Sequence, residues 1–89
     1  MIIQHQVNGD KGKFFVMEDD KRIALMKYRL KNRNMEIYHT EVEEEHRHKK
    51  IGTQLVEQGV AYAREKNLTI VPICEFVKTL LSERNELAG

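Results

Sequence analysis

A run of basic and imidazole side chains is the part of the sequence most suited to binding chemistry. Residues 46–50 read His-Arg-His-Lys-Lys and stand immediately before, or in the first turn of, a helical pattern that begins at Ile51. The N-terminal end of a helix prefers acidic side chains, so the four residues Arg47–Lys50 are unfavourable there unless something negative is bound. Helix N-terminal amides bind phosphate well, which favours a phosphate or pyrophosphate ligand. The alternative is a solvated charge run, balanced by the three glutamates at 43–45.

The segment Ile51–Lys66 is the clearest helix in the sequence. Its inward positions form an apolar stripe and a neighbouring stripe of small residues: Ile51, Leu55 and Tyr62, then Gly52, Val56, Gly59 and Ala63. A glycine inside a helix costs about 1 kcal/mol relative to alanine. Two on one stripe therefore predict a close approach to a sheet or to a ligand. Asn67 is predicted to end the helix in the left-handed conformation.

Three strands are predicted before this helix: Lys13–Met17, Arg22–Leu30 and Met35–Val42. The third has an irregular pattern, since Met35 and Ile37 share one face whereas Tyr38, Thr40 and Val42 share the other. Such a phase change indicates either a β-bulge or a strand covered on both faces.

Two further elements follow the helix. Leu68–Cys74 is almost entirely apolar, which predicts a parallel strand buried on both faces and joined by a right-handed crossover. Pro72 cannot donate to a ladder, so we expect this strand to separate from its neighbour there. A short helix over Glu75–Arg84 has four residues on its predicted inner face: Phe76, Val77, Leu80 and Leu81. The expected fold is therefore α/β with a mixed sheet: about three antiparallel strands, a crossover helix, a splayed parallel strand and a short helix.

Length and composition limit the number of domains and the class of protein. A chain of 89 residues predicts one domain over 1–89 with a thin core, to which a bound ligand or a second copy of the chain would add stability. A homodimer is one such arrangement. Hydrophobic residues make up 40% and charged residues 33%, which is typical of a globular protein. The net charge of +1 points to no class of partner by itself.

The location follows from the cysteine count and from hydropathy. Cys74 is the one cysteine, which excludes an intrachain disulfide and a cysteine-based zinc site and fits a reducing compartment. No apolar run is long enough for a signal peptide or a membrane span. We therefore expect a cytoplasmic protein with no membrane partner.

Four segments follow one another in a recognisable order: His-Thr-Glu-Val at 39–42, Arg-His-Lys-Lys-Ile-Gly at 47–52, Ile-Gly-Thr-Gln-Leu-Val at 51–56 and Val-Pro-Ile-Cys-Glu-Phe-Val at 71–77. Together they resemble the GNAT superfamily of acyl-CoA-dependent N-acyltransferases, and within it the very small stand-alone GNAT-like proteins. Residues 47–52 match in part the superfamily signature Gln/Arg-x-x-Gly-x-Gly/Ala, and the flanking segments are more specific than this motif. The resemblance covers roughly residues 38–78.

This resemblance implies a minimal GNAT fold that binds acetyl-CoA as co-substrate and transfers the acetyl group to a primary amine. It places the pyrophosphate on a loop made of Arg47, His48, Lys49, Lys50, Ile51, Gly52 and Thr53. It places the pantetheine chain along the bulged strand at Glu41 and Val42, and the acetyl group in the gap between the splayed strands. The acceptor stays open, as a protein side chain or a small exposed amine.

The chain departs from the family pattern at several positions. Lys50 replaces the first motif glycine and His48 the glycine that usually follows the arginine; glycine there permits positive φ and a close approach of phosphate. We expect the charge of Lys50 to compensate. Leu80 lies nearest to the position of a tyrosine that protonates the leaving thiolate in many GNAT enzymes, and the common His-Pro-Glu-Tyr tail reads Arg-Asn-Glu-Leu at 84–87.

The candidate catalytic residues are Glu41 and Cys74. Glu41 is either a base that takes a proton from the incoming ammonium or an exposed strand-end carboxylate. Cys74 is either an acyl acceptor or an inert buried thiol; we favour direct transfer over an acetyl-Cys74 route. His39 is either a structural hydrogen-bonding residue or a base. His46 and His48 match no standard zinc spacing, so no metal is expected.

Two other functions compete with the enzyme. A module that binds acyl-CoA with little turnover is favoured by the missing tyrosine. A nucleic-acid binder would use Arg47–Lys50 together with Lys11, Lys13 and Lys21. The low net charge and the lack of aromatic residues within the basic run argue against nucleic acid.

Overall fold

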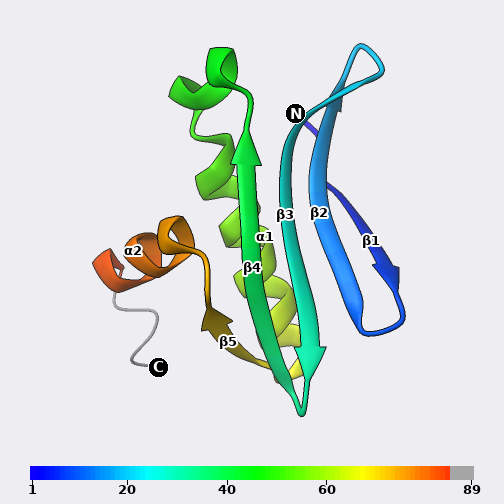
Figure 1. Cartoon of the computed structure of the whole chain (residues 1–89), viewed down its shortest axis with the longest axis vertical. Helices are drawn as coiled ribbons and strands as arrows, with labels where there is room; N and C mark the ends of the chain where they lie inside the picture. The colour runs from blue at the N-terminus through cyan, green and yellow to red at the C-terminus, as the bar shows by residue number, and fades with distance from the viewer. Residues whose placement is uncertain (85–89) are drawn as a thin grey trace.

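The structure, a computed structural model, describes residues 1–84; the tail at 85–87 considered above lies outside this range. Residues 1–84 form five strands, two α-helices and one 3₁₀ helix (Figure 1). In chain order these are β1 (Gln4–Asn8), β2 (Lys11–Glu18), β3 (Lys21–Lys31), β4 (Asn34–Val42), η1 (Glu44–Lys49), α1 (Ile51–Lys66), β5 (Thr69–Pro72) and α2 (Glu75–Glu83).

The strands form one sheet in the order β1-β2-β3-β4-β5. The first four strands are antiparallel neighbours, and β5 pairs parallel to β4. The predicted α/β class with a mixed sheet is therefore confirmed, but the antiparallel part has four strands rather than about three. The prediction missed β1 because all five of its residues are exposed, so it shows no apolar alternation.

The core lies between the sheet and α1, which runs behind β3 and β4 in Figure 1. Met26, Tyr28, Met35, Ile37 and Leu55 are each fully buried in it. At Gly59 an added Cβ would come 2.7 Å from the Cε of Met26, so this glycine allows the close helix–sheet approach that the small-residue stripe predicted. The opposite face of the sheet carries no helix within residues 1–84.

The ends of α1 follow the prediction. The helix runs over Ile51–Lys66, and Asn67 closes it at φ 57°, ψ 45°, with its amide donating to the carbonyls of Ala63 and Arg64. Within residues 1–84 no helix is long and apolar enough to cross a membrane.

A bulge in β4 decides which of its side chains face α1. Lys27 pairs with His39, whereas the next residue, Tyr28, pairs with Ile37, so Tyr38 is the extra residue. After the bulge Thr40 lies opposite the buried Met26. The bulge alternative is thus confirmed, and it returns Thr40 and Val42 to the face of the sheet that carries Ile37.

The strand β5 separates from β4 as Pro72 predicted. Pairing ends at Ile37 with Pro72, after which the amides of Ile73 and Cys74 both donate to the carbonyl of Ile37, at 2.9 and 3.1 Å. The prediction that this strand is buried on both faces is wrong. Its residues are exposed or half-buried, because β5 is the edge of the sheet.

The helix α2 packs on the core through Val77 and Leu81, which are almost fully buried. The predicted inner position of Phe76 is wrong, since this side chain is 45% exposed. Leu80 is half-buried. The observed inner face is therefore narrower than the predicted one, and Phe76 is left beside the start of α1.

Candidate active site

A pocket of about 410 Å³ lies where the end of β4, the start of α1 and the start of α2 meet. We call it the β4–α1 pocket; its lining residues are Thr40, Glu41, Val42, Arg47, Lys50, Gly52, Thr53 and Phe76. Six of these were predicted as cofactor-binding residues, from Glu41 to Thr53. Three other predicted residues do not line the pocket: His48 and Lys49 are exposed on η1, and Ile51 is buried in the core.

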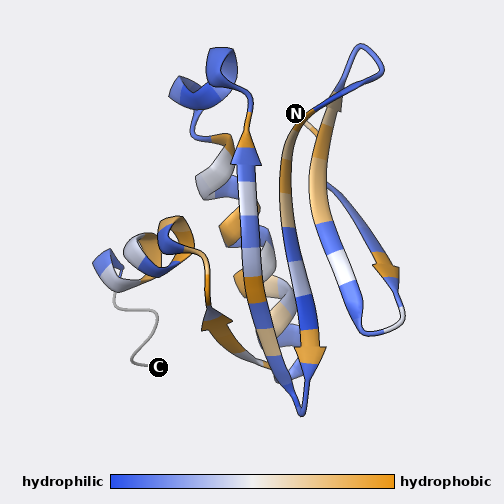
Figure 2. Cartoon of the chain, in the orientation of Figure 1, coloured by the Kyte–Doolittle hydropathy of each residue, from blue (hydrophilic) through white to orange (hydrophobic). Residues whose placement is uncertain are grey.

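The basic segment forms the 3₁₀ helix η1 over most of its length, where we expected a loop or the first turn of α1. Figure 2 shows η1 as hydrophilic throughout. Lys50 separates η1 from α1 and adopts φ 57°, ψ 32°, in the left-handed region. This conformation costs a residue with a Cβ about 1–2 kcal/mol, a cost that glycine avoids. The chain therefore keeps a backbone shape suited to glycine while placing a lysine there.

The N-terminus of α1 has no cap from the described chain. Lys50, the N-cap residue, makes no side-chain capping bond, and the first turn holds no acidic residue. The amide of Gln54 is bonded to the carbonyl of Lys50 at 3.2 Å. The preceding amides, among them those of Gly52 and Thr53, have no acceptor within an α-helix. Since both residues line the pocket, their donors are suited to an anion.

Arg47 connects η1 to the end of β4. Its Nε donates to the carbonyl of Val42 at 3.1 Å, which holds the guanidinium at the pocket. The terminal guanidinium nitrogens have no carboxylate partner within residues 1–84. Arg47 thus adds positive charge beside the uncapped helix end, but it also occupies the carbonyl of Val42, one of the two residues that we expected to contact pantetheine.

Gly52 forms part of the pocket wall under Phe76. An added Cβ would lie 3.0 Å from Cζ of Phe76 and 3.5 Å from Cγ2 of Val42. Any side chain here would press on the aromatic ring and fill space beside the free amides. A residue larger than glycine would therefore have to displace the ring of Phe76.

Cys74 meets Thr40 across the gap between β4 and α2. Its Sγ lies 3.0 Å from Oγ1 of Thr40, and Cys74 is the N-cap residue of α2. The thiol is half-buried. Thr40 lines the β4–α1 pocket, so Cys74 borders the pocket through this hydroxyl.

The carboxylate of Glu41 belongs to the other face of β4. Because strand side chains alternate, Glu41 points away from the side that Thr40 and Val42 occupy. It contacts Nε2 of His39 at 3.1 Å and the guanidinium of Arg22 at 3.6 Å, and it is about half exposed. The structure therefore does not bring the two candidate catalytic side chains, Glu41 and Cys74, together.

A family described as GCN5-related N-acetyl-transferase matches residues 13–89. The chain belongs to this family. Its structure is similar to the solution NMR structure of a GCN5-like candidate N-acetyltransferase from Staphylococcus aureus, with a TM-score of 0.74 and 28% sequence identity over 96% of this chain and 83% of that chain. Comparison with curated proteins gave no match.

Two residues of this GCN5-related N-acetyltransferase line the pocket without having been assigned to it from the sequence. Thr40 and Phe76 both lie inside the quoted motif segments, 39–42 and 71–77, but their periodicity placed them elsewhere. Phe76 was assigned to the core because it shares a helical face with Leu80. The bulge at Tyr38 turns Thr40 toward the pocket, and the packing of α2 through Val77 and Leu81 leaves Phe76 beside Gly52.

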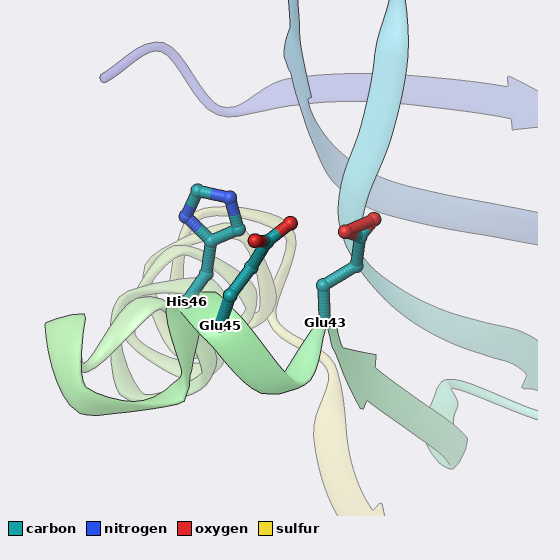
Figure 3. A group of neighbouring side chains, drawn as sticks. All are labelled: Glu43, Glu45 and His46. Carbon is teal, nitrogen blue, oxygen red and sulfur yellow. The ribbon is translucent and has the colours of Figure 1, made fainter.

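Figure 3 shows a cluster of three side chains, Glu43, Glu45 and His46, whose ligand atoms lie within 4.8 Å of one another. Ammonium groups already contact two of them. The Nζ of Lys21 lies 3.0 Å from Glu43, and that of Lys49 lies 3.3 Å from Nδ1 of His46. His46 is 8% exposed. The contact of Lys49 lies within η1, but Nε2 of His46 also lies 3.7 Å from Glu18 at the end of β2. Together with the Lys21–Glu43 pair, this contact anchors η1 against the β2–β3 turn.

Proposed function

We propose that this GCN5-related N-acetyltransferase binds acetyl-CoA in the β4–α1 pocket and transfers its acetyl group to a primary amine. The observation that carries the proposal is the uncapped start of α1 inside a pocket that also holds Arg47 and Lys50. Amide donors, the helix dipole and two cations together are suited to a pyrophosphate. The pocket volume of about 410 Å³ is within the range of small-molecule sites.

The rest of the co-substrate follows the free edge of β4. Beyond Ile37 this edge has no β5 partner, so its backbone groups, apart from the Val42 carbonyl that Arg47 engages, are available to the amide groups of pantetheine. The thioester then lies near Thr40 and Cys74, in the gap that the separation of β5 opens. Positioning of the two reactants supplies much of the rate enhancement in such a reaction.

The chemical step is an attack of the neutral amine on the thioester carbonyl. A base first removes one proton from the acceptor ammonium. The C–N bond forms, the carbonyl oxygen becomes an oxyanion that backbone donors stabilise, and the C–S bond then breaks. The second amine proton neutralises the CoA thiolate. Glu41 is the proposed base; it acts through water from the open face of β4, next to His39.

Binding is tested by thermal unfolding with millimolar acetyl-CoA, CoA and AMP. Acetyl-CoA and CoA are expected to raise the midpoint clearly, and AMP much less, because AMP lacks the pyrophosphate and the pantetheine chain. No shift with acetyl-CoA would refute the proposal.

The second candidate is an acyl-CoA-binding module with little turnover, which the presence of Leu80 in place of a tyrosine favours. Release of free CoA thiol from acetyl-CoA in the presence of a mixture of polyamines, amino acids and lysine peptides separates the two. Tight binding without thiol release for any acceptor would support the module.

A further inference from the structure

A second hollow lies on the open face of the sheet, opposite to α1. It encloses about 330 Å³, and we call it the lysine hollow after its lining side chains: Gln6, Asn8, Lys11, Lys13, Lys27 and Tyr38. Lys27 alternates along β3 with the buried Met26 and Tyr28, so its side chain leaves the sheet on the side away from the core. No residue of the β4–α1 pocket belongs to this hollow.

The strand register places like charges directly opposite one another in the lysine hollow. Lys13 on β2 pairs with Lys27 on β3. The same row continues to Gln6 on β1 and to His39 on β4, so it holds no carboxylate across four strands. Like charges at opposing positions of an antiparallel pair destabilise a sheet. The arrangement is therefore locally unfavourable until an anion lies between the ammonium groups.

Three other cations of β3 have carboxylate partners, whereas these lysines do not. Arg29 is paired with Glu36, Lys21 with Glu43 and Arg22 with Glu41. Across residues 1–84, no carboxylate oxygen lies within 4.0 Å of the three ammonium groups of the hollow. Lys13 and Lys27 are half-buried, so solvent screens their repulsion less than it would on an open surface.

We propose that the lysine hollow binds a small anion that carries two or more phosphate or carboxylate groups. Lys11 and Lys13 are two residues apart on one strand, a separation of about 7 Å, and Lys27 lies about 5 Å across the sheet. One anionic group can bridge one such pair, so three ammonium groups favour at least two. The amide side chains of Gln6 and Asn8 add neutral donors at the rim.

The size and the aromatic contacts favour a small molecule over a nucleic acid. A volume of about 330 Å³ is at the lower end of small-molecule sites. Single-stranded nucleic acids are held largely by bases stacked on free aromatic rings. Here the two nearby rings already carry cations, Lys13 at 5.3 Å from the Phe15 centroid and Arg29 at 5.2 Å from that of Tyr38.

The test is an NMR titration of the full chain with inorganic tripolyphosphate and, separately, with citrate, at low salt. Saturable shifts of the backbone amides of Lys13 and Lys27 are expected with at least one probe, and the effective probe identifies phosphate or carboxylate as the preferred group. The double variant Lys13→Gln/Lys27→Gln should bind at least tenfold more weakly, while the matched control Lys78→Gln on α2 binds as the wild type does. Equal affinity in the double variant would overturn the proposal.

Two further measurements separate this site from the β4–α1 pocket and from nucleic acid. Acetyl-CoA affinity should be unchanged in the double variant, and Lys50→Glu should leave the tripolyphosphate-induced shifts at Lys13 and Lys27 unchanged. Shifts confined to Gly52 and Thr53 would instead assign the anion to the helix start and refute the lysine hollow. Tighter binding of a ten-nucleotide single strand through the same lysines would show that the lysine hollow binds a nucleic acid and not a small anion.

Discussion

The two faces of β4 present different chemistry to solvent. On the α1 side, Thr40 and Val42 border a pocket whose anion donors are mainly backbone amides. On the open side, His39 and Glu41 form a contact at 3.1 Å, next to a hollow whose donors are lysine side chains. The bulge at Tyr38 makes the difference, since without it Thr40 would face the open side. One extra residue therefore decides which face carries which chemistry.

The difference has a consequence for how each face tolerates change. Backbone amides are fixed by the helix and cannot be removed by substitution, but they can be crowded. Lysine ammonium groups are lost one at a time, each with a gradual effect on an anion and a strong dependence on salt. The β4–α1 pocket should therefore respond most to added bulk, and the lysine hollow to removed charge.

The largest effect is expected on turnover, from a substitution on the open face. With Glu41 as the base, Glu41→Gln should lower kcat/KM about 10²-fold or more, most clearly where the carboxylate is ionised and the amine is still protonated. The assay follows CoA thiol release against pH. The matched control is Glu36→Gln, a second outward carboxylate on the same strand.

Cys74→Ala, on the α1 side, should change the same rate only slightly, and the wild-type protein incubated with acetyl-CoA alone should show no acetyl adduct by mass spectrometry. A chemically competent acetyl-Cys74 intermediate with ping-pong kinetics would show that Cys74, on the α1 side, carries the acetyl group during transfer. Wild-type turnover in Glu41→Gln/Cys74→Ala would leave positioning as the whole mechanism.

A tenfold or larger loss of acetyl-CoA affinity, about 1.4 kcal/mol or more, is expected for Gly52→Val. The added Cβ meets Phe76 at 3.0 Å, and the branched chain fills space beside the free amides. Isothermal titration measures the affinity, and Ala61→Val, at an exposed position of the same helix, is the control. In Gly52→Val/Phe76→Ala the steric contact is relieved; full recovery of affinity there would show that the amides were never crowded.

An effect of about 1 kcal/mol on stability is expected at Lys50. Lys50→Gly relieves the left-handed backbone and should raise the free energy of unfolding in urea by about that amount. His48→Gly, within η1, should lower it. Affinity for acetyl-CoA should change in the opposite direction, because both substitutions at Lys50 remove a positive charge. Lys50→Gly should bind more weakly than the wild type, and Lys50→Glu more weakly still. Wild-type affinity in both variants would show that the side chain points away from the ligand.

The smallest effect concerns the α1 side where it reaches β1. His5 stacks on Phe14 with ring centroids 4.0 Å apart, and its Nε2 lies 2.6 Å from the hydroxyl of Tyr28. Although His5 is exposed overall, its ring is partly desolvated against Phe14 and Tyr28, which lowers its pKa below the usual 6.5, and burial raises the pKa of Tyr28 well above its usual range. The unfolded chain then binds the His5 proton more readily than the folded chain.

The contribution of neutral His5 to the free energy of unfolding should therefore be fully present above pH 6.5 and should fall modestly as the pH drops below this value. Urea unfolding between pH 7.5 and about 5 measures the slope. The slope should be smaller in His5→Phe, which keeps the stack, and unchanged in His48→Gln. An equal slope in His5→Phe would assign the acid sensitivity to other groups.

Short sequence patterns predicted much of the fold. The period of the apolar residues defined α1 from Ile51 to Lys66, and Asn67 closed it because its side chain tolerates the left-handed region. Pro72 marked where β5 leaves β4 because proline has no amide to donate. These features depend on a few neighbouring residues, so the sequence by itself determined them. The phase change after Ile37 left two alternatives, a bulge and a strand covered on both faces, and the register of β3 with β4 decided for the bulge.

Features that depend on contacts distant in sequence were decided only by the tertiary structure. The strand β1 exists because β2 offers it a partner edge, although its own residues are all exposed. Lys50 adopts a conformation that its type disfavours, because η1 is anchored on one side and α1 packs on the other. The separation of Glu41 from Cys74, the contact of Cys74 with Thr40 and the opposition of Lys13 and Lys27 all follow from strand register. Register depends on the whole sheet, and no single segment encodes it.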